Sequence, residues 1–125
     1  MNLKLELIPV PVADIDRAKH FYAEQVGFRL DHDVRPGGPV RVVQLTPPGS
    51  ACSVVLAEGL AGIAMAPGSL RGLHLVVDSI EEARAALAGR GVAMGAIQDL
   101  GGIKYSGFQD PDGNTWTLQE ISGQR

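Results

Sequence analysis

The chain has 125 residues, a formal net charge of -3 and a pI near 5.5. This length suits one compact domain with a hydrophobic core and is short for two independent domains. No two Lys or Arg residues are adjacent, so the sequence lacks the basic surface that attracts nucleic acids or anionic membranes. We therefore expect neither a nucleic acid nor a membrane as a partner.

The cysteine content and the amino-terminal residues indicate the compartment. Cys52 is the single cysteine, which excludes a disulfide within the chain. Lys4 and Glu6 stand where a signal peptide would need an apolar run. We expect a cytoplasmic protein. Its sixteen glycines and eight prolines predict many turns and a fold rich in strands.

An internal repeat organises the chain. Residues 12–18 align without a gap with residues 77–83, at an offset of 65 residues (77 minus 12). In each copy an apolar strand is followed by a residue that can cap a helix, Asp14 or Ser79. Helical spacing then predicts two equivalent apolar stripes, made of Ile15, Ala18 and Tyr22 in the first copy and Ile80, Ala83 and Leu87 in the second.

Each predicted helix ends near a glycine and is followed by three apolar segments separated by turns. These segments cover residues 28–34, 40–46 and 52–57 in the first half, and residues 92–98, 103–109 and 115–121 in the second. Residues 110–114 read DPDGN, a strong signal for a hairpin turn. The sequence thus predicts one α+β domain over residues 1–125, built from two βαβββ modules, about 1–58 and 70–125. We expect a cupped mixed sheet with the helices outside.

The motif DIDRA at residues 14–18, the pairs Phe21-Tyr22 and Gly27-Phe28, and the DPDGN turn together resemble the vicinal oxygen chelate superfamily, which includes glyoxalase, bleomycin-resistance and extradiol dioxygenase proteins. The resemblance implies a cup around a pocket in which His and Glu side chains often chelate a divalent metal. Transferred to this sequence, those ligand positions fall on Leu7, Gly72 and Thr117. None of these residues is a suitable ligand, so we expect neither a metal nor another cofactor.

Strand alternation selects the candidate site residues in the second half. It places His74 on the pocket side of its strand, as a ligand contact, a general base or simply a histidine satisfied by a neighbour. Thr117 and Gln119 share the pocket side of the last strand as polar contacts. Tyr105 offers a phenol as a donor or weak acid, or else only packs.

In the first half, Arg41 stands among valines and either selects an anionic ligand or extends to water from an edge. Pro9 shares a face with Leu7, and its missing N–H group indicates an edge strand or a bulge. The predicted ligand-binding set is therefore Leu7, Pro9, Arg41, Gly72, His74, Tyr105, Thr117 and Gln119.

These residues favour a small-molecule-binding protein of the glyoxalase and bleomycin-resistance type, which holds a metabolite or drug in an apolar cup. Whether the chain is an enzyme stays open. One alternative is a metal-dependent lyase, isomerase or dioxygenase with displaced ligands, and another is a metal-free acid–base catalyst that uses His74 with Tyr105. The resemblance and the exposed sheet edges also predict a homodimer.

Overall fold

The computed structural model describes residues 1–60 and 65–121, so residues 122–125 of the predicted second module lie outside it. The first module contains strands β1 (Leu7–Pro9), β2 (Arg29–Gly37), β3 (Val40–Thr46) and β4 (Ser53–Glu58), and the helices α1 (Ile15–His20) and η1 (Phe21–Val26). The second contains β5 (Leu73–Val76), β6 (Gln98–Leu100), β7 (Ile103–Gln109) and β8 (Thr115–Ile121), with helix α2 (Ile80–Gly89). Among the described helices, none is long and apolar enough to cross a membrane.

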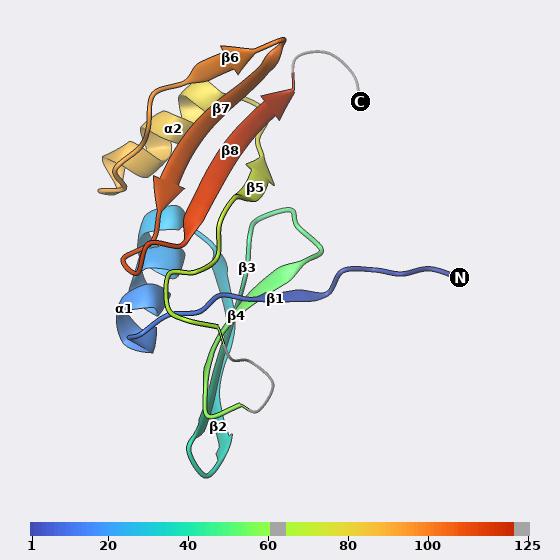
Figure 1. Cartoon of the computed structure of the whole chain (residues 1–125), viewed down its shortest axis with the longest axis vertical. Coiled ribbons are helices and arrows are strands. Elements are labelled where there is room, and N and C mark those ends of the chain that lie inside the picture. Colours follow the sequence, from blue (N-terminus) through green and yellow to red (C-terminus); the bar gives the residue numbers. More distant parts are fainter. Residues whose placement is uncertain (61–64, 122–125) are drawn as a thin grey trace.

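The two modules form equivalent four-stranded mixed sheets, which confirms the predicted α+β fold. The strand order is β1-β4-β3-β2 in the first sheet and β5-β8-β7-β6 in the second. In each sheet the outer strand before the helix is parallel to its neighbour, whereas the other pairs are antiparallel. Figure 1 shows the two sheets following one another along the long axis, with α1 and α2 on the same side.

The helices begin and end where the sequence predicts. The side chains of Asp14 and Ser79 accept hydrogen bonds from the N–H groups of Arg17 (3.1 Å) and Glu82 (3.3 Å) at the two helix starts. The first helix continues from α1 into η1, a π-helical segment. It ends at Gly27, whose φ of 94° would strain any other residue.

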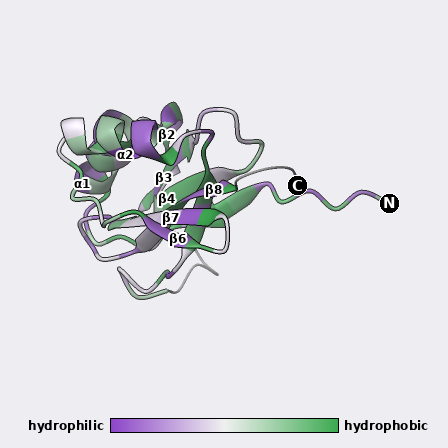
Figure 2. Cartoon of the chain, turned by 90° about the horizontal axis from the view of Figure 1, so that it is seen from above, coloured by the Kyte–Doolittle hydropathy of each residue, from purple (hydrophilic) through white to green (hydrophobic). Residues whose placement is uncertain are grey.

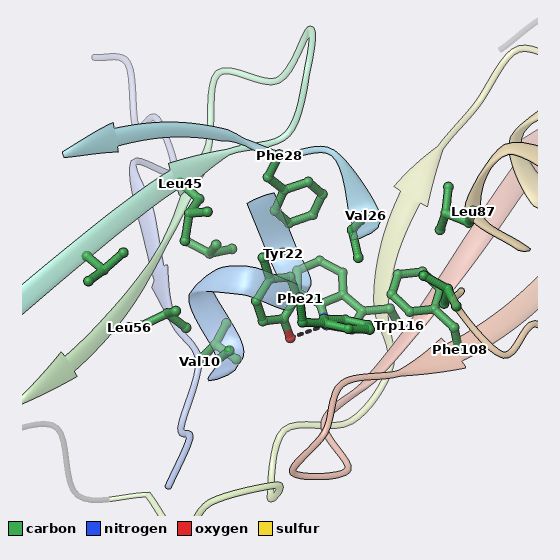
Figure 3. Close-up of a cluster of buried hydrophobic side chains, with 14 of the residues drawn as sticks. Val10, Phe21, Tyr22, Val26, Phe28, Leu45, Leu56, Leu87, Phe108 and Trp116 are labelled. Atoms are coloured by element: carbon green, nitrogen blue, oxygen red, sulfur yellow. Dashed lines mark hydrogen bonds between the residues drawn. The ribbon is translucent and has the colours of Figure 1, made fainter. Parts of the chain in front are cut away.

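One continuous hydrophobic core joins the modules. The rings of Tyr22, Phe28 and Trp116 lie with centroids 5.6–5.7 Å apart, so residues of both modules meet at the centre of the core (Figure 3). Leu45 and Leu56 from the first sheet extend this core below α1. Because neither module buries its apolar helix face alone, we expect the two to fold as one unit.

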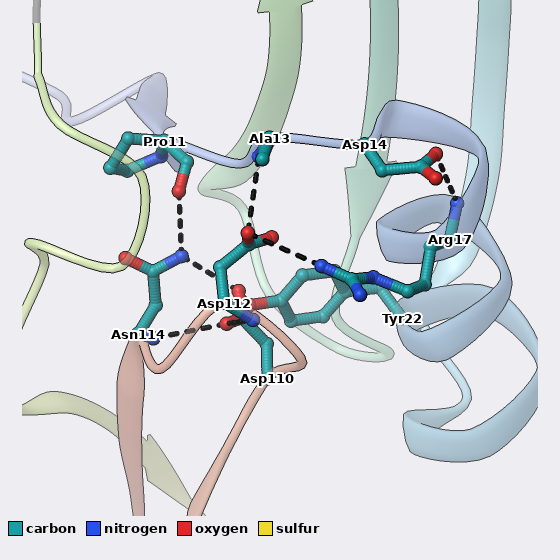
Figure 4. A network of polar contacts seen from close by, with 8 residues as sticks. All are labelled: Pro11, Ala13, Asp14, Arg17, Tyr22, Asp110, Asp112 and Asn114. Carbon is teal, nitrogen blue, oxygen red and sulfur yellow. Dashed lines mark hydrogen bonds and ion pairs between the residues drawn. The ribbon is translucent and has the colours of Figure 1, made fainter.

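The DPDGN turn fastens the second module to the first (Figure 4). The buried carboxylate of Asp110 accepts from the hydroxyl of Tyr22 (2.7 Å) and from the side-chain amide of Asn114 (2.7 Å). The same Asn114 amide donates to the carbonyl of Pro11 (2.8 Å), and Asp112 accepts from Arg17 at 3.4 Å. The polar residues of this turn therefore hold the structure together, and none of them faces the candidate site described below.

One predicted strand is wrong. Residues 92–97 were expected to continue as a strand, but regular pairing starts only at Gln98. Val92 and Met94 instead pack on the core, and Gly95 makes a single backbone bond, from its N–H to the carbonyl of Gly107 (2.8 Å). The apolar alternation of this segment reflects core packing without a β-ladder.

Candidate functional site

The two sheets each have a face turned away from the helices, which we call the open face. In the second sheet, Leu73, Leu75 and Leu118 pack towards the helices. Because side chains alternate along a strand, the open face carries their neighbours. These are His74 and Val76 on β5, Thr117 and Gln119 on β8, and Tyr105 on β7.

Three predicted site residues are in contact on this open face. The Nδ1 atom of His74 lies 2.7 Å from Oε1 of Gln119. The ring of Tyr105 stands edge-on to the imidazole of His74, with centroids 6.1 Å apart and an interplanar angle of 87°. Strand β8 lies between β5 and β7 (Figure 1), so Gln119 bridges the other two side chains. The strand register thus brings together the residues that could bind a polar group or transfer a proton.

Thr117 lies beside this trio, one step along the same face. It is the register partner of His74, and its side chain is half-buried. A hydroxyl at this place can donate or accept a hydrogen bond. Gln98, which sequence reasoning did not single out, is the partner of Tyr105 on β6 and extends the row of polar side chains.

The first sheet presents an apolar surface at the equivalent positions. Ile8 pairs with Val54 and Leu73 pairs with Trp116, so the repeat offset is 65 residues on the outer strands (73 minus 8) and 62 on the last strands (116 minus 54). The counterpart of His74 is therefore Pro9. By the same register, Ala57 corresponds to Gln119 and Val42 to Tyr105. One open face offers hydrogen-bonding groups, whereas the other offers only apolar contact at these positions.

A polar cluster lies at one end of the first open face, and the sequence did not predict it. The carboxylate of Asp31 accepts from the hydroxyl of Thr46 and from the amide of Gln44 (3.2 Å). Bonds from Thr46 and then from Arg29 lower the pKa of Asp31 to about 2. An irregularity in the pairing of β2 with β3 lies at Leu30 and His32 and changes the alternation there. Simple alternation, which grouped Asp31 with Asp33, therefore fails.

The prediction that Arg41 faces the pocket is wrong. Arg41 shares its face of β3 with Val43 and Leu45, which are fully buried under the helices. Its guanidinium donates to both carboxylate oxygens of Asp33 (3.1 and 2.8 Å) and pairs with Asp16 at the start of α1 (2.8 Å). The Arg41 guanidinium, followed by Lys19, holds the pKa of Asp33 well below its usual range. Arg41 therefore joins a helix to the sheet on the side opposite the candidate site.

The family's metal positions do not fit a metal in this chain. Leu7 has an apolar side chain, and Gly72 has none. Gly72 precedes β5 with a φ of 77°, and its N–H donates to the carbonyl and hydroxyl of Thr115 (3.1 and 2.8 Å). A histidine would be strained at this φ. Within residues 1–60 and 65–121, no three His, Cys, Asp or Glu side chains converge as metal ligands would.

Two hollows border the second sheet. A cleft of about 410 Å³ follows the free edge of β5 between the modules, where His74 and Val76 face Phe28 and the loop Pro47–Ser50. Its lining is mostly apolar, which is typical of small-molecule sites. A shallower hollow of about 440 Å³ is lined by Thr115 and Thr117. The candidate side chains therefore lie on surfaces that are concave at both ends.

Comparisons with solved structures agree with this geometry. TnmS3, described as an antibiotic binding protein from Streptomyces sp. CB03234, is 40% identical, with a TM-score of 0.85 over 97% of this chain and 98% of that one. A glyoxalase/bleomycin resistance protein from the same strain is 41% identical, with a TM-score of 0.78 over 92% and 98% of the two chains. A superfamily member from Sphaerobacter thermophilus DSM 20745 is 30% identical, with a TM-score of 0.81 over 95% and 98%.

The sequence comparison points to the same family. No curated protein matches the chain. A family model, described as Glyoxalase/Bleomycin resistance protein/Dioxygenase superfamily, matches residues 4–118. This match covers both modules, from the residues before β1 into β8. The chain therefore belongs to the Glyoxalase/Bleomycin resistance protein/Dioxygenase superfamily.

Proposed function

We propose that this protein binds a small, largely apolar molecule on the open faces of its sheets and does so without a metal. The observation that carries the proposal is the asymmetry of the two open faces. Pro9, Val42 and Ala57 supply an apolar surface, whereas His74, Tyr105 and Gln119 supply hydrogen bonds at the equivalent place. Apolar contact gives affinity, and a few fixed polar groups give orientation and specificity.

The relatives support a drug or a drug-like metabolite as the ligand. TnmS3 is described as antibiotic binding, and its 40% identity extends over nearly the whole of both chains. Holding such a molecule needs only complementary surfaces, and no chemical step is required. Sequestration of an antibiotic is therefore the function that we propose for this chain.

We further propose that two copies form the complete cup. Residues 1–6 extend away from the body of the molecule (Figures 1 and 2), and Leu3 and Leu5 are 89% and 67% exposed. Val76 on the outer strand β5 is also 59% exposed. Exposed apolar groups beside free strand edges favour association with a second copy of the same chain. A reducing cytoplasm suits the half-buried free thiol of Cys52.

Sedimentation equilibrium tests the dimer. We expect a mass of twice 13.2 kDa at micromolar concentration, and dissociation when Leu5 is replaced by Glu. The Lys4→Glu variant, which changes a charge on the same arm, is the control and should remain dimeric. A mass of one chain at every concentration would contradict the dimer.

A second candidate function is metal-free acid–base catalysis. The contacts of His74 with Gln119 and Tyr105 favour it, because an oriented imidazole beside a phenol is a common proton-transfer arrangement. Metal-dependent lyase, isomerase or dioxygenase activity has no comparable support from the donor set. Incubating each bound compound with the protein, followed by mass spectrometry, separates the two functions: a new product indicates catalysis, and an unchanged compound indicates binding alone.

A thermal-shift screen tests the proposed binding directly. The panel contains apolar antibiotics, including cationic ones, and glutathione conjugates. A compound present at about 100 times its Kd should stabilise the fold by about 2.7 kcal/mol. The shift should persist in EDTA and should weaken in His74→Ala, while the matched variant His20→Ala, on helix α1, should behave as the parent does. If no compound raises the melting temperature, the proposal fails.

A further inference from the structure

The hydrogen bond between His74 and Gln119 specifies more than their contact. Oε1 of Gln119 is an amide oxygen, which accepts hydrogen bonds and cannot donate them. At 2.7 Å from this oxygen, Nδ1 of His74 must carry a proton. A neutral imidazole has one N–H group, so the remaining nitrogen, Nε2, bears a lone pair.

We infer that Gln119 fixes the tautomer of His74, so that Nε2 accepts a hydrogen bond from a hydroxyl group of the bound molecule. This inference rests on the proposed function and adds a chemical class to it. The ligand is an apolar compound with a phenol, enol or alcohol hydroxyl that reaches β5. Gln119 acts through His74 and is therefore a positioning residue.

The surroundings hold both side chains in place. Gln119 belongs to β8, which is paired on one side with β5 and on the other with β7, so its backbone is fixed by two ladders. The edge of the Tyr105 ring approaches the imidazole at 87°, which restricts rotation of His74. A nitrogen oriented in this way reads the donor or acceptor character of whatever is placed against it.

The apolar neighbours make the acceptor selective. Val76 lies on the same strand face as His74, and Phe28 and Pro48 line the cleft that reaches it. When a ligand covers Nε2 and excludes water, an unpaired lone pair carries a desolvation penalty. A ligand that offers only an ether oxygen leaves Nε2 unpaired, whereas a hydroxyl satisfies it. The site therefore distinguishes a hydroxyl compound from its methyl ether.

The first test is nitrogen-15 NMR of the His74 ring in the full chain without ligand. We expect a protonated Nδ1 and an unprotonated Nε2 in the neutral ring. Gln119→Leu should give a tautomer mixture, and Gln119→Glu, which keeps an acceptor at the same place, should restore protonation at Nδ1. Protonation of Nε2 in the parent protein, or a tautomer that is indifferent to Gln119→Leu, would overturn the inference. Because all three readings concern the ring itself, a merely structural role for Gln119 would not produce them.

The second test compares the binding of 1-naphthol and 1-methoxynaphthalene, monitored by amide NMR shifts up to the solubility limit. The hydroxyl compound should bind roughly ten-fold more tightly, as one hydrogen bond to an oriented acceptor allows. The preference should vanish in His74→Leu and remain in His20→Leu. Equal binding of both compounds would refute the tautomer-based selectivity while leaving the proposed binding function intact. If neither compound shifts open-face amides, both the selectivity and the binding of small apolar molecules are contradicted.

Discussion

The replacement Tyr22→Phe tests whether the polar network around the DPDGN turn joins the two modules. The Tyr22 hydroxyl is fully buried, donates to Asp110 at 2.7 Å and accepts from the indole N–H of Trp116 at 2.9 Å. Burial, followed by the Asp110 carboxylate, raises the pKa of Tyr22 far above its usual range, so this hydroxyl keeps its proton at every practical pH. It therefore serves as a permanent donor.

The cost of removing this hydroxyl follows from what it leaves behind. The indole N–H of Trp116 loses its acceptor in a residue that is only 3% exposed, which costs about 1–3 kcal/mol. Asp110 loses one charge-assisted bond but keeps the amide of Asn114 and two backbone N–H donors. We expect a total loss of about 2–4 kcal/mol in the free energy of unfolding. At this chain length that corresponds to a fall in Tm of roughly 8–16 °C.

Urea unfolding and thermal melting measure this loss, and Tyr105→Phe is the matched control. Within the described part of the chain, the Tyr105 hydroxyl has no hydrogen-bond partner, and we expect its removal to change stability by less than about 0.5 kcal/mol. If Tyr22→Phe is no more destabilising than Tyr105→Phe, the network does not stabilise the junction between the modules as argued.

The other predictions concern a close backbone contact, an acid transition and the corrected position of Arg41. Gly68 and Gly72 share a φ of 77°, but a Cβ at Gly68 would lie 2.0 Å from the carbonyl oxygen of Asp112, whereas none of the protein atoms lies within 4 Å of one at Gly72. Gly68→Ala should therefore prevent stable folding, while Gly72→Ala should cost only about 1–2 kcal/mol, as circular dichroism melts can show. The folded-state pKa of Asp31, about 2, lies below its unfolded value of about 3.9, so its stabilisation is present above pH 4 and is lost as the pH falls towards 2. Asp31→Asn should flatten the pH dependence of unfolding in this range, and an unchanged slope would refute the role given to the carboxylate. Arg41→Ala should cost about 1–3 kcal/mol by urea unfolding but leave the affinity for a bound compound unchanged, and a large loss of affinity would restore Arg41 to the site.

The parts of the fold that follow local rules could be predicted from the sequence. The offset of 65 residues located both modules, and the caps Asp14 and Ser79 located the helix starts. On β8 the regular alternation of apolar and polar residues correctly placed Thr117 and Gln119 on the face away from the helices. Whether these residues bind a ligand remains a proposal.

The errors arise where pairing or tertiary packing overrides a local pattern. Valines surround Arg41, so only the burial of Val43 and Leu45 shows which face of β3 covers the helices. The irregular pairing near Asp31 has no sequence signal, and it moved a carboxylate to the other face. Gly72 precedes its strand with a left-handed φ, which strand alternation does not anticipate.

The contact between His74 and Gln119 depends on which strands are neighbours, and the sequence left that order open. The two residues are 45 positions apart, and they meet because β5 runs parallel to β8. The sequence therefore supplied the candidate side chains, while the sheet order supplied the pairing on which the tautomer inference depends.

The central claim is that the open faces bind a small molecule through the protein's own side chains, without a metal. The most direct measurement is amide NMR mapping of the first compound that raises the melting temperature, recorded with and without EDTA. We predict shifts at Val42 and Ala57 in the first sheet and at His74 and Tyr105 in the second, unchanged by the chelator. Shifts confined to the helix side, or a footprint that disappears in EDTA, would contradict this account.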